Sequence, residues 1–255
     1  MSLHIEISGS GPDLVLLHGW AMNSSIWDSL TPFLASRFKV HRVDLPGHGS
    51  SAAYVPYTLD AIADALSAGM PPQAIVCGWS LGGQLALTWA LRRPAQCVRL
   101  VLIATTPCFM RGADWEHGIG DAVFNDFSHD LATDCRAALR RFSVLQASGD
   151  ADARAVLRQL NKCTSAHGEP NVESLELALR ILRNTDLRNR LAGIVQPALL
   201  LHGERDAVVP HAASAYCQGM MPHAVLDVIA DTAHVPFLAR PQQVARRITE
   251  FCFGQ

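Results

Sequence analysis

Short, mostly hydrophobic runs alternate with helical patterns in the amino-terminal part of the chain. They lie at 14–17, 40–43, 74–77 and 100–104. A strand that is buried on both faces carries apolar side chains on both, so such runs predict the central strands of a parallel sheet joined by crossover helices. Two similar runs, at 198–201 and 225–229, predict that the same sheet resumes much later in the chain.

The pattern between these two parts is helical instead. Apolar residues recur at helix spacing, as at Phe124, Phe127 and Leu131, and no run resembles a buried strand. A helical pattern also ends the chain, where Val244 and Ile248 share a face. We therefore predict an α/β core of residues 1–107 and 191–255 that is interrupted by an all-helical insertion of residues 108–190.

The run at 74–77 leads directly into a glycine-flanked serine, Gly78-Trp79-Ser80-Leu81-Gly82, and then into a helical pattern. Glycines two positions on either side of a serine allow the close packing of a sharp strand-to-helix turn, which lifts the hydroxyl above the sheet. The helix amino terminus favours negative charge at that place. The motif predicts Ser80 as a nucleophile. The alternative is a glycine-rich turn whose serine only caps the helix.

A serine nucleophile needs a base and an acid, and both are expected on loops after the last strands. His234 follows the run at 225–229, and Asp206 follows the run at 198–201 just before Val208. The chain order of serine, acid and histidine is the one used with this kind of turn. Asp206 is preferred to Glu204, which we expect to face solvent or pair with Arg205. An exposed loop histidine is the alternative for His234.

An oxyanion hole requires two backbone amides, one from the residue after the nucleophile and one from an early loop. Leu81 provides the first, and Trp20 in His18-Gly19-Trp20 the second. We expect the side chains of Trp20 and Trp79 to flank the cleft, with core packing as the alternative. The remaining histidines, among them His18 and His202 beside glycines at strand ends, are interpreted as packed or solvated.

Together these segments resemble the α/β-hydrolase superfamily and, within it, the pimeloyl-[acyl-carrier protein] methyl ester esterase family. The motifs that carry the resemblance are at 18–20, 78–83, 106–109, 141–146, 182–188 and 233–237. The resemblance implies an α/β-hydrolase fold, a mostly parallel sheet flanked by helices with an all-helical cap inserted after the sixth strand. It implies hydrolysis of a carrier-bound methyl ester in biotin synthesis, without a metal or cofactor.

The same resemblance assigns roles to individual residues. Ser80, Asp206 and His234 are the implied triad, and Trp20 and Leu81 the implied oxyanion residues. The implied substrate-binding residues are Trp20, Phe142, Ser143, Val144, Leu145, Gln146 and His234.

An acyl-carrier protein is acidic, so a basic surface is expected where it docks. The stretch 136–162 contains six basic and two acidic residues, a local balance of +4. The family's docking arginines fall at Arg141, Arg154 and Arg158, whereas a further one falls on Ala137. An ordinary solvated helix face is the alternative.

Composition limits the other partners. The chain has 255 residues, 49% of them hydrophobic, and a formal net charge of −2, which gives no field to attract nucleic acid or an anionic membrane. No leader or spanning segment is evident, and the seven cysteines are scattered. We expect a cytoplasmic monomer with reduced thiols.

Other functions remain open at this point, because a fold does not determine chemistry. A general short-chain carboxylesterase would use the same triad. A lyase or carbon–carbon bond hydrolase uses a similar one, and a ligand receptor can retain a triad with little turnover.

Overall fold

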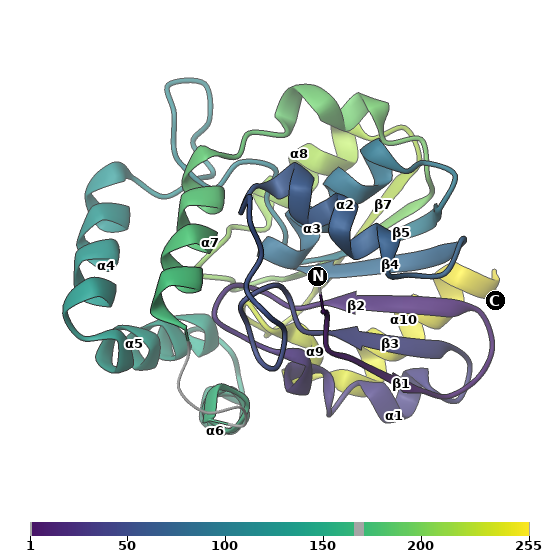
Figure 1. Ribbon diagram of the computed structural model, residues 1–255, viewed down its shortest axis with the longest axis horizontal. Coiled ribbons are helices and arrows are strands. Elements are labelled where there is room, and N and C mark those ends of the chain that lie inside the picture. The colour runs from purple at the N-terminus through teal and green to yellow at the C-terminus, as the bar shows by residue number, and fades with distance from the viewer. Residues whose placement is uncertain (1, 166–170, 255) are drawn as a thin grey trace.

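One seven-stranded sheet organises the protein (Figure 1). The computed structural model describes residues 2–165 and 171–254. The spatial order is β1-β3-β2-β4-β5-β6-β7, and every neighbouring pair is parallel except β1 with β3. The strands are β1 Ile5–Ser8, β2 Asp13–Leu17, β3 Lys39–Val43, β4 Ala74–Trp79, β5 Cys97–Ile103, β6 Ala198–Gly203 and β7 Ala224–Ile229.

All six hydrophobic runs of the sequence fall on strands, so the mostly parallel sheet is confirmed. The runs predict the central strands well because β2, β4, β5 and β6 carry buried side chains along nearly their whole length. The hydrophobic runs do not predict the short edge strand β1. Its four residues are half-buried or exposed, so it forms no hydrophobic run.

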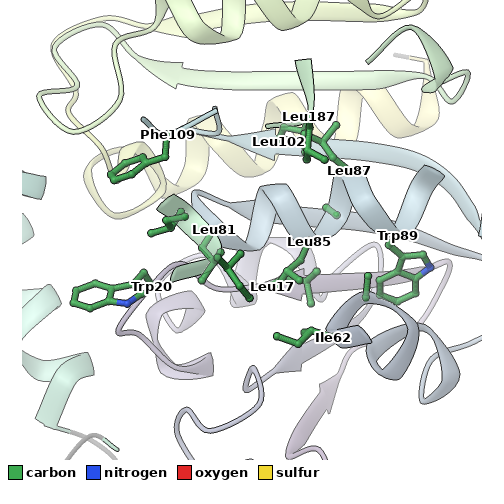
Figure 2. Packing of buried hydrophobic residues seen from close by; sticks show 14 of the residues in the cluster. Leu17, Trp20, Ile62, Leu81, Leu85, Leu87, Trp89, Leu102, Phe109 and Leu187 are labelled. Atoms are coloured by element: carbon green, nitrogen blue, oxygen red, sulfur yellow. The ribbon is translucent and has the colours of Figure 1, made fainter. Parts of the chain in front are cut away.

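Helices cover both faces of the sheet, and successive strand residues point alternately into two separate cores. Val15 and Leu17 of β2 pack in the core beneath α2, α3 and α8, while Leu14 and Leu16 pack in the core beneath α1, α9 and α10. Figure 2 shows the first core, with Trp89 at one end and Trp20 and Phe109 at the other. These helices are α1 Thr31–Leu34, α2 Leu59–Ala68, α3 Leu81–Arg92, α8 Ala212–Met220, α9 Pro236–Ala239 and α10 Pro241–Phe253.

Four further helices lie between β5 and β6 in the chain and gather at one end of the sheet (Figure 1). The Trp20 indole, just beyond the carboxyl end of β2, donates a hydrogen bond to the Leu175 carbonyl oxygen in this group at 2.9 Å. The group therefore lies at the carboxyl ends of the strands, where sites in this type of sheet form. Its helices are α4 Asp121–Thr133, α5 Cys135–Ala147, α6 Ala153–Ser165 and α7 Val172–Asn184.

Two details of the predicted insertion are corrected. It follows the fifth strand rather than the sixth, because the residues before β2 supply only one strand, β1. It is also not helical throughout. Its first residues, before α4, form short bridges such as Met110 with Ile119 and Cys108 with Asp186.

Two short 3-10 helices, η1 Ser24–Trp27 and η2 Arg188–Gly193, complete the helical segments of the described chain. Within those residues, no helix combines the length and the apolar character that a bilayer span requires.

Candidate active site

Ser80 lies in a sharp turn between β4 and α3, with φ 54° and ψ −118°. This region is rarely adopted by a residue with a side chain and marks local strain. The turn is tight: a Cβ at Gly78 would stand 2.2 Å from the Gly82 carbonyl oxygen, and one at Gly82 would stand 2.2 Å from the Leu17 carbonyl oxygen. Only glycine fits at either position, which explains the spacing around the serine.

The Ser80 hydroxyl does not cap the helix. The amides of Gly83 and Gln84 donate to the Ser80 carbonyl oxygen, and the side chain makes no capping hydrogen bond. Ser80 is half-buried, whereas Trp79 and Leu81 on either side of it are buried. The capping alternative is therefore wrong, and the hydroxyl is available for chemistry.

His234 lies on the loop between β7 and α9 and meets Asp206 from the loop after β6. Its Nδ1 is 2.7 Å from Oδ2 of Asp206. Because the carboxylate can only accept, Nδ1 carries the hydrogen, and in the neutral ring the lone pair that a general base needs lies on Nε2. Nε2 is buried and has no partner among the described residues. His234 is 1% exposed, which excludes an exposed loop histidine.

Asp206 is held by four hydrogen bonds. Oδ1 accepts from the amides of Val208 at 2.8 Å and Val209 at 2.9 Å. Oδ2 faces His234 and, at 3.1 Å, Nε2 of His202. Burial alone would raise the pKa of Asp206, but electrostatic attraction to the His234 ring and the hydrogen bonds from both histidines outweigh it and hold this pKa well below its usual range. Asp206 is therefore a carboxylate at neutral pH.

The loop that carries His234 is fixed from two sides. The Trp79 indole, next to Ser80 in the chain, donates to the His234 carbonyl oxygen at 2.9 Å, and the His234 amide donates to the Gln146 carbonyl oxygen at 3.2 Å. Trp79 also packs on Phe237. It is thus buried in the core rather than flanking an open cleft, and it connects the Ser80 turn to the His234 loop.

The two candidate oxyanion amides come from Trp20 and Leu81, which are both buried. Within the described residues neither backbone N–H donates a hydrogen bond. Gly19 permits the turn before Trp20, because a Cβ there would stand 2.9 Å from the Trp79 ring. Both residues border the core shown in Figure 2. Two free amides at this place suit a developing oxyanion.

The predicted cap segment on α5 divides into two faces. Phe142 packs edge-on against the Trp20 ring, with 5.3 Å between the ring centroids. The Gln146 side chain is fully buried and neither of its polar atoms has a partner in the described chain. By contrast, Val144 is 55% exposed and Leu145 43% exposed. The structure brings Phe142 and Gln146 toward the site and turns Val144 and Leu145 toward the surface.

Ser143 and the predicted docking arginines complete the predicted set. The buried Ser143 hydroxyl donates to the Leu139 carbonyl oxygen within α5, at 3.1 Å. Arg141 is exposed and pairs with Asp130 at 2.6 Å. Arg154 and Arg158 are exposed on α6, and neither has an ion-pair partner within the described residues.

The contact between His202 and Asp206 is not predicted by the sequence. The prediction treated His202 as a packed or solvated strand-end histidine, and it is fully buried, but it also bonds the proposed acid. The available signal was its position at the end of a strand four residues before Asp206. Within the described residues, no cluster of histidine, cysteine and carboxylate side chains could hold a metal ion.

Comparisons with known proteins show which family has this arrangement. A family model described as the alpha/beta hydrolase family matches residues 14–247, which is most of the chain. The chain belongs to the alpha/beta hydrolase family. Among curated relatives, a pimeloyl-[acyl-carrier protein] methyl ester esterase of Nitrosomonas europaea is 43% identical, covering 95% of this chain and 96% of the relative. One of the same name from Stenotrophomonas maltophilia is 42% identical, covering 98% and 96%.

Solved structures of alpha/beta hydrolases superpose closely on the chain. An esterase from Exiguobacterium antarcticum matches with a TM-score of 0.88 and 22% identity, covering 98% of this chain and 94% of that one. A bromoperoxidase from Bacillus anthracis matches with a TM-score of 0.89 and 20% identity, covering 98% and 95%. At such low identity these neighbours confirm the predicted fold class and nothing finer.

Proposed function

We propose that this alpha/beta hydrolase removes the methyl ester from pimeloyl-acyl-carrier-protein methyl ester in biotin synthesis. The observation that carries ester hydrolysis is His234, buried with Nδ1 2.7 Å from Oδ2 of Asp206 and with Nε2 unpartnered among the described residues. The names of relatives that are 42–43% identical over nearly the whole chain support the substrate.

The proposed reaction proceeds through an acyl-enzyme. His234 Nε2 takes the hydroxyl proton of Ser80 while Oγ attacks the ester carbonyl carbon, and the amides of Trp20 and Leu81 stabilise the oxyanion. The tetrahedral intermediate collapses, and methanol leaves with the proton from His234. Water then gives a proton to His234 and attacks the acyl-enzyme, which releases the free carboxylate and restores Ser80.

The helical insertion acts as the cap in this proposal. Residues 108–190 form the cap and residues 1–107 and 191–255 the catalytic core. Trp20, Phe142 and the unpartnered Gln146 carboxamide contact the acyl chain. The thioester to the carrier survives because the arm reaches Ser80 only with its far end, so the methyl ester, and not the thioester, meets the nucleophile.

The carrier protein docks on the basic face of the cap, at Arg141, Arg154 and Arg158. Arg154 and Arg158 are exposed and unpaired within the described chain, so they can meet an acidic partner without breaking an existing ion pair. Arg154→Glu with Arg158→Glu is expected to raise KM for the carrier-bound ester by at least about tenfold, since like charges oppose association. KM for a free short ester stays unchanged.

A matched control reverses the same amount of charge elsewhere. Arg93→Glu with Arg246→Glu changes two exposed arginines outside the cap. This control is expected to leave both KM values near those of the wild type. If KM for the carrier-bound ester rises equally in both double variants, the docking surface is removed from the proposal.

Complementation tests the biological role. The gene is expected to restore growth without biotin to a bacterium that lacks its own esterase for this step, and the Ser80→Ala variant is expected to fail at equal protein level. If the protein hydrolyses p-nitrophenyl esters rapidly but does not complement, it is an esterase that acts on another substrate. We also propose that the enzyme is cytoplasmic and monomeric, and sedimentation at the mass of one chain tests the second point.

A further inference from the structure

Asp206 carries a second imidazole besides His234. His202, near the end of β6, is fully buried, and its Nε2 lies 3.1 Å from Oδ2 of Asp206 and 2.9 Å from the Val209 carbonyl oxygen. Its Nδ1 lies 2.7 Å from Oγ of Ser214 on α8. One carboxylate oxygen therefore faces two histidines from different parts of the chain.

The partners of His202 determine where its hydrogen lies. The Asp206 carboxylate and the Val209 carbonyl can only accept, so Nε2 must carry a hydrogen, and it donates to both. Ser214 can donate or accept, which makes it compatible with Nδ1 in either protonation state of the ring. The contact with Asp206 is thus a donation to the carboxylate, as required for a role in placing the acid.

The contact also joins Asp206 to rigid elements. Among the described residues, Oδ1 is held only by amides of its own loop, those of Val208 and Val209. The His202 ring extends from β6 and is fixed by Ser214 on α8, so it ties the other oxygen to the sheet and to a helix. Without it, His234 alone would define the position of Oδ2.

We propose that His202 is a positioning residue of the triad, which holds Oδ2 of Asp206 toward His234 and takes up part of the carboxylate charge. The inference rests on the proposed triad, and it assigns the role to a residue that does not touch the substrate. Ser214 supports it by fixing the ring.

The consequence for catalysis is positional. A donor on Oδ2 keeps this oxygen in line with Nδ1 of His234, so removal of the donor leaves the base less well oriented. In the described chain the titratable side chains that contact Asp206 are His202 from β6 and His234 from the β7–α9 loop. Glu204 and Arg205 on the same loop are exposed and engage Asp231 instead.

Two substitutions of His202 separate donation from packing. His202→Phe keeps a ring but loses the donor, while His202→Gln retains an N–H near the position of Nε2. With a free p-nitrophenyl ester, His202→Phe is expected to lower kcat about 10- to 100-fold, the range for losing a hydrogen bond to a charged group, with KM little changed. His202→Gln is expected to restore most of kcat, because it keeps the donor to Asp206.

A second readout needs no turnover. The Nδ1–H of His234 is followed by proton NMR in the wild-type protein and in the variants. Its resonance is expected to move in His202→Phe and to return toward the wild-type position in His202→Gln. If the wild-type protein hydrolyses no ester, the proposed function fails while this resonance still tests the role of His202. If His202→Phe does not fold, Ser214→Ala decides by the same readouts with a smaller effect. An unchanged kcat and an unchanged Nδ1–H resonance would make His202 a core residue only and overturn the inference.

Discussion

At the scale of single residues, the site depends on a carboxylate that is buried and yet ionised. Asp206 has no exposed side chain, and a lone buried charge is costly. The amides of Val208 and Val209 and the two imidazoles compensate for that cost. The same contacts fix the His234 ring, so the stability of the acid and the orientation of the base have a common origin.

Asp206→Asn tests this assignment. The amide keeps the size of the side chain but can present its NH₂ to His234, which then takes the wrong tautomer and loses the lone pair at Nε2. We expect kcat for a short ester to fall on the order of 10⁴-fold, with a much smaller change in the free energy of unfolding. Steady-state kinetics and urea denaturation measure the two. Turnover near that of the wild type would remove Asp206 from the triad.

The sequence predicts much of the site at this scale because its signals are local. The glycines around Ser80 report a tight turn, and the order of Ser80, Asp206 and His234 along the chain follows the strands. Contacts between distant segments leave no such signal. The donation from His202 and the buried carboxamide of Gln146 depend on how side chains meet in space, so they emerge only from the structure.

At the scale of elements, the turn between α5 and α6 is fastened to the loop that carries the base. The Ala233 amide donates to Oδ2 of Asp150 at 3.1 Å, and the Ala151 amide donates to the Asp231 carbonyl oxygen at 3.0 Å. With the bond from the His234 amide to the Gln146 carbonyl oxygen at the end of α5, three hydrogen bonds join this part of the insertion to the loop. The helical insertion therefore helps to place the histidine as well as covering the sheet edge.

Asp150→Ala is expected to weaken this connection. It leaves the buried Ala233 amide without its acceptor, which costs about 1–3 kcal/mol of stability, and it loosens the residue next to His234. We expect kcat to fall more than KM rises for a short ester, and kinetics with urea denaturation check both. Asp152→Ala is the control, because Asp152 is exposed and pairs with Arg240 at the surface. Equal effects in the two variants would exclude a particular role for Asp150.

Elements were predictable in proportion to their burial. The central strands and the longer helices α4, α7 and α10 follow periodic patterns of hydrophobic residues. The edge strand β1 and the bridged segment before α4 do not, because hydrogen bonds rather than a buried face define them. The resemblance, and not the hydrophobic pattern, placed the insertion after a sixth strand, which was wrong because five strands precede it, while the fold class and the family were confirmed.

At the scale of the whole molecule, buried histidines link stability to pH. Burial lowers the pKa of His18 to about 3 and lowers the pKa of His48 as well. Hydrogen bonds from the Ser50 and Ser24 amides outweigh burial and lower the pKa of Asp44, which stays ionised throughout mild acid. Both rings are therefore neutral in the folded protein but protonated in the unfolded chain below about pH 6.5.

Stability is expected to fall as the pH is lowered from 6.5 toward 4.5. The unfolded chain binds protons there that the folded chain does not, so each histidine removes up to about 1.4 kcal/mol per pH unit. Urea denaturation at several pH values measures the slope, and His48→Gln is expected to make it shallower. Slopes that coincide for wild type and variant would contradict the contribution of His48.

The central claim is that Ser80 cleaves the methyl ester of a carrier-bound pimeloyl chain and spares the thioester. The most direct test incubates the purified enzyme with pimeloyl-acyl-carrier-protein methyl ester. The mass of the intact carrier protein is then measured by mass spectrometry. We predict a carrier that has lost the methyl group and keeps the pimeloyl chain, with one methanol released per carrier and no change with Ser80→Ala. An unaltered carrier, or one stripped of its acyl chain, would contradict the account.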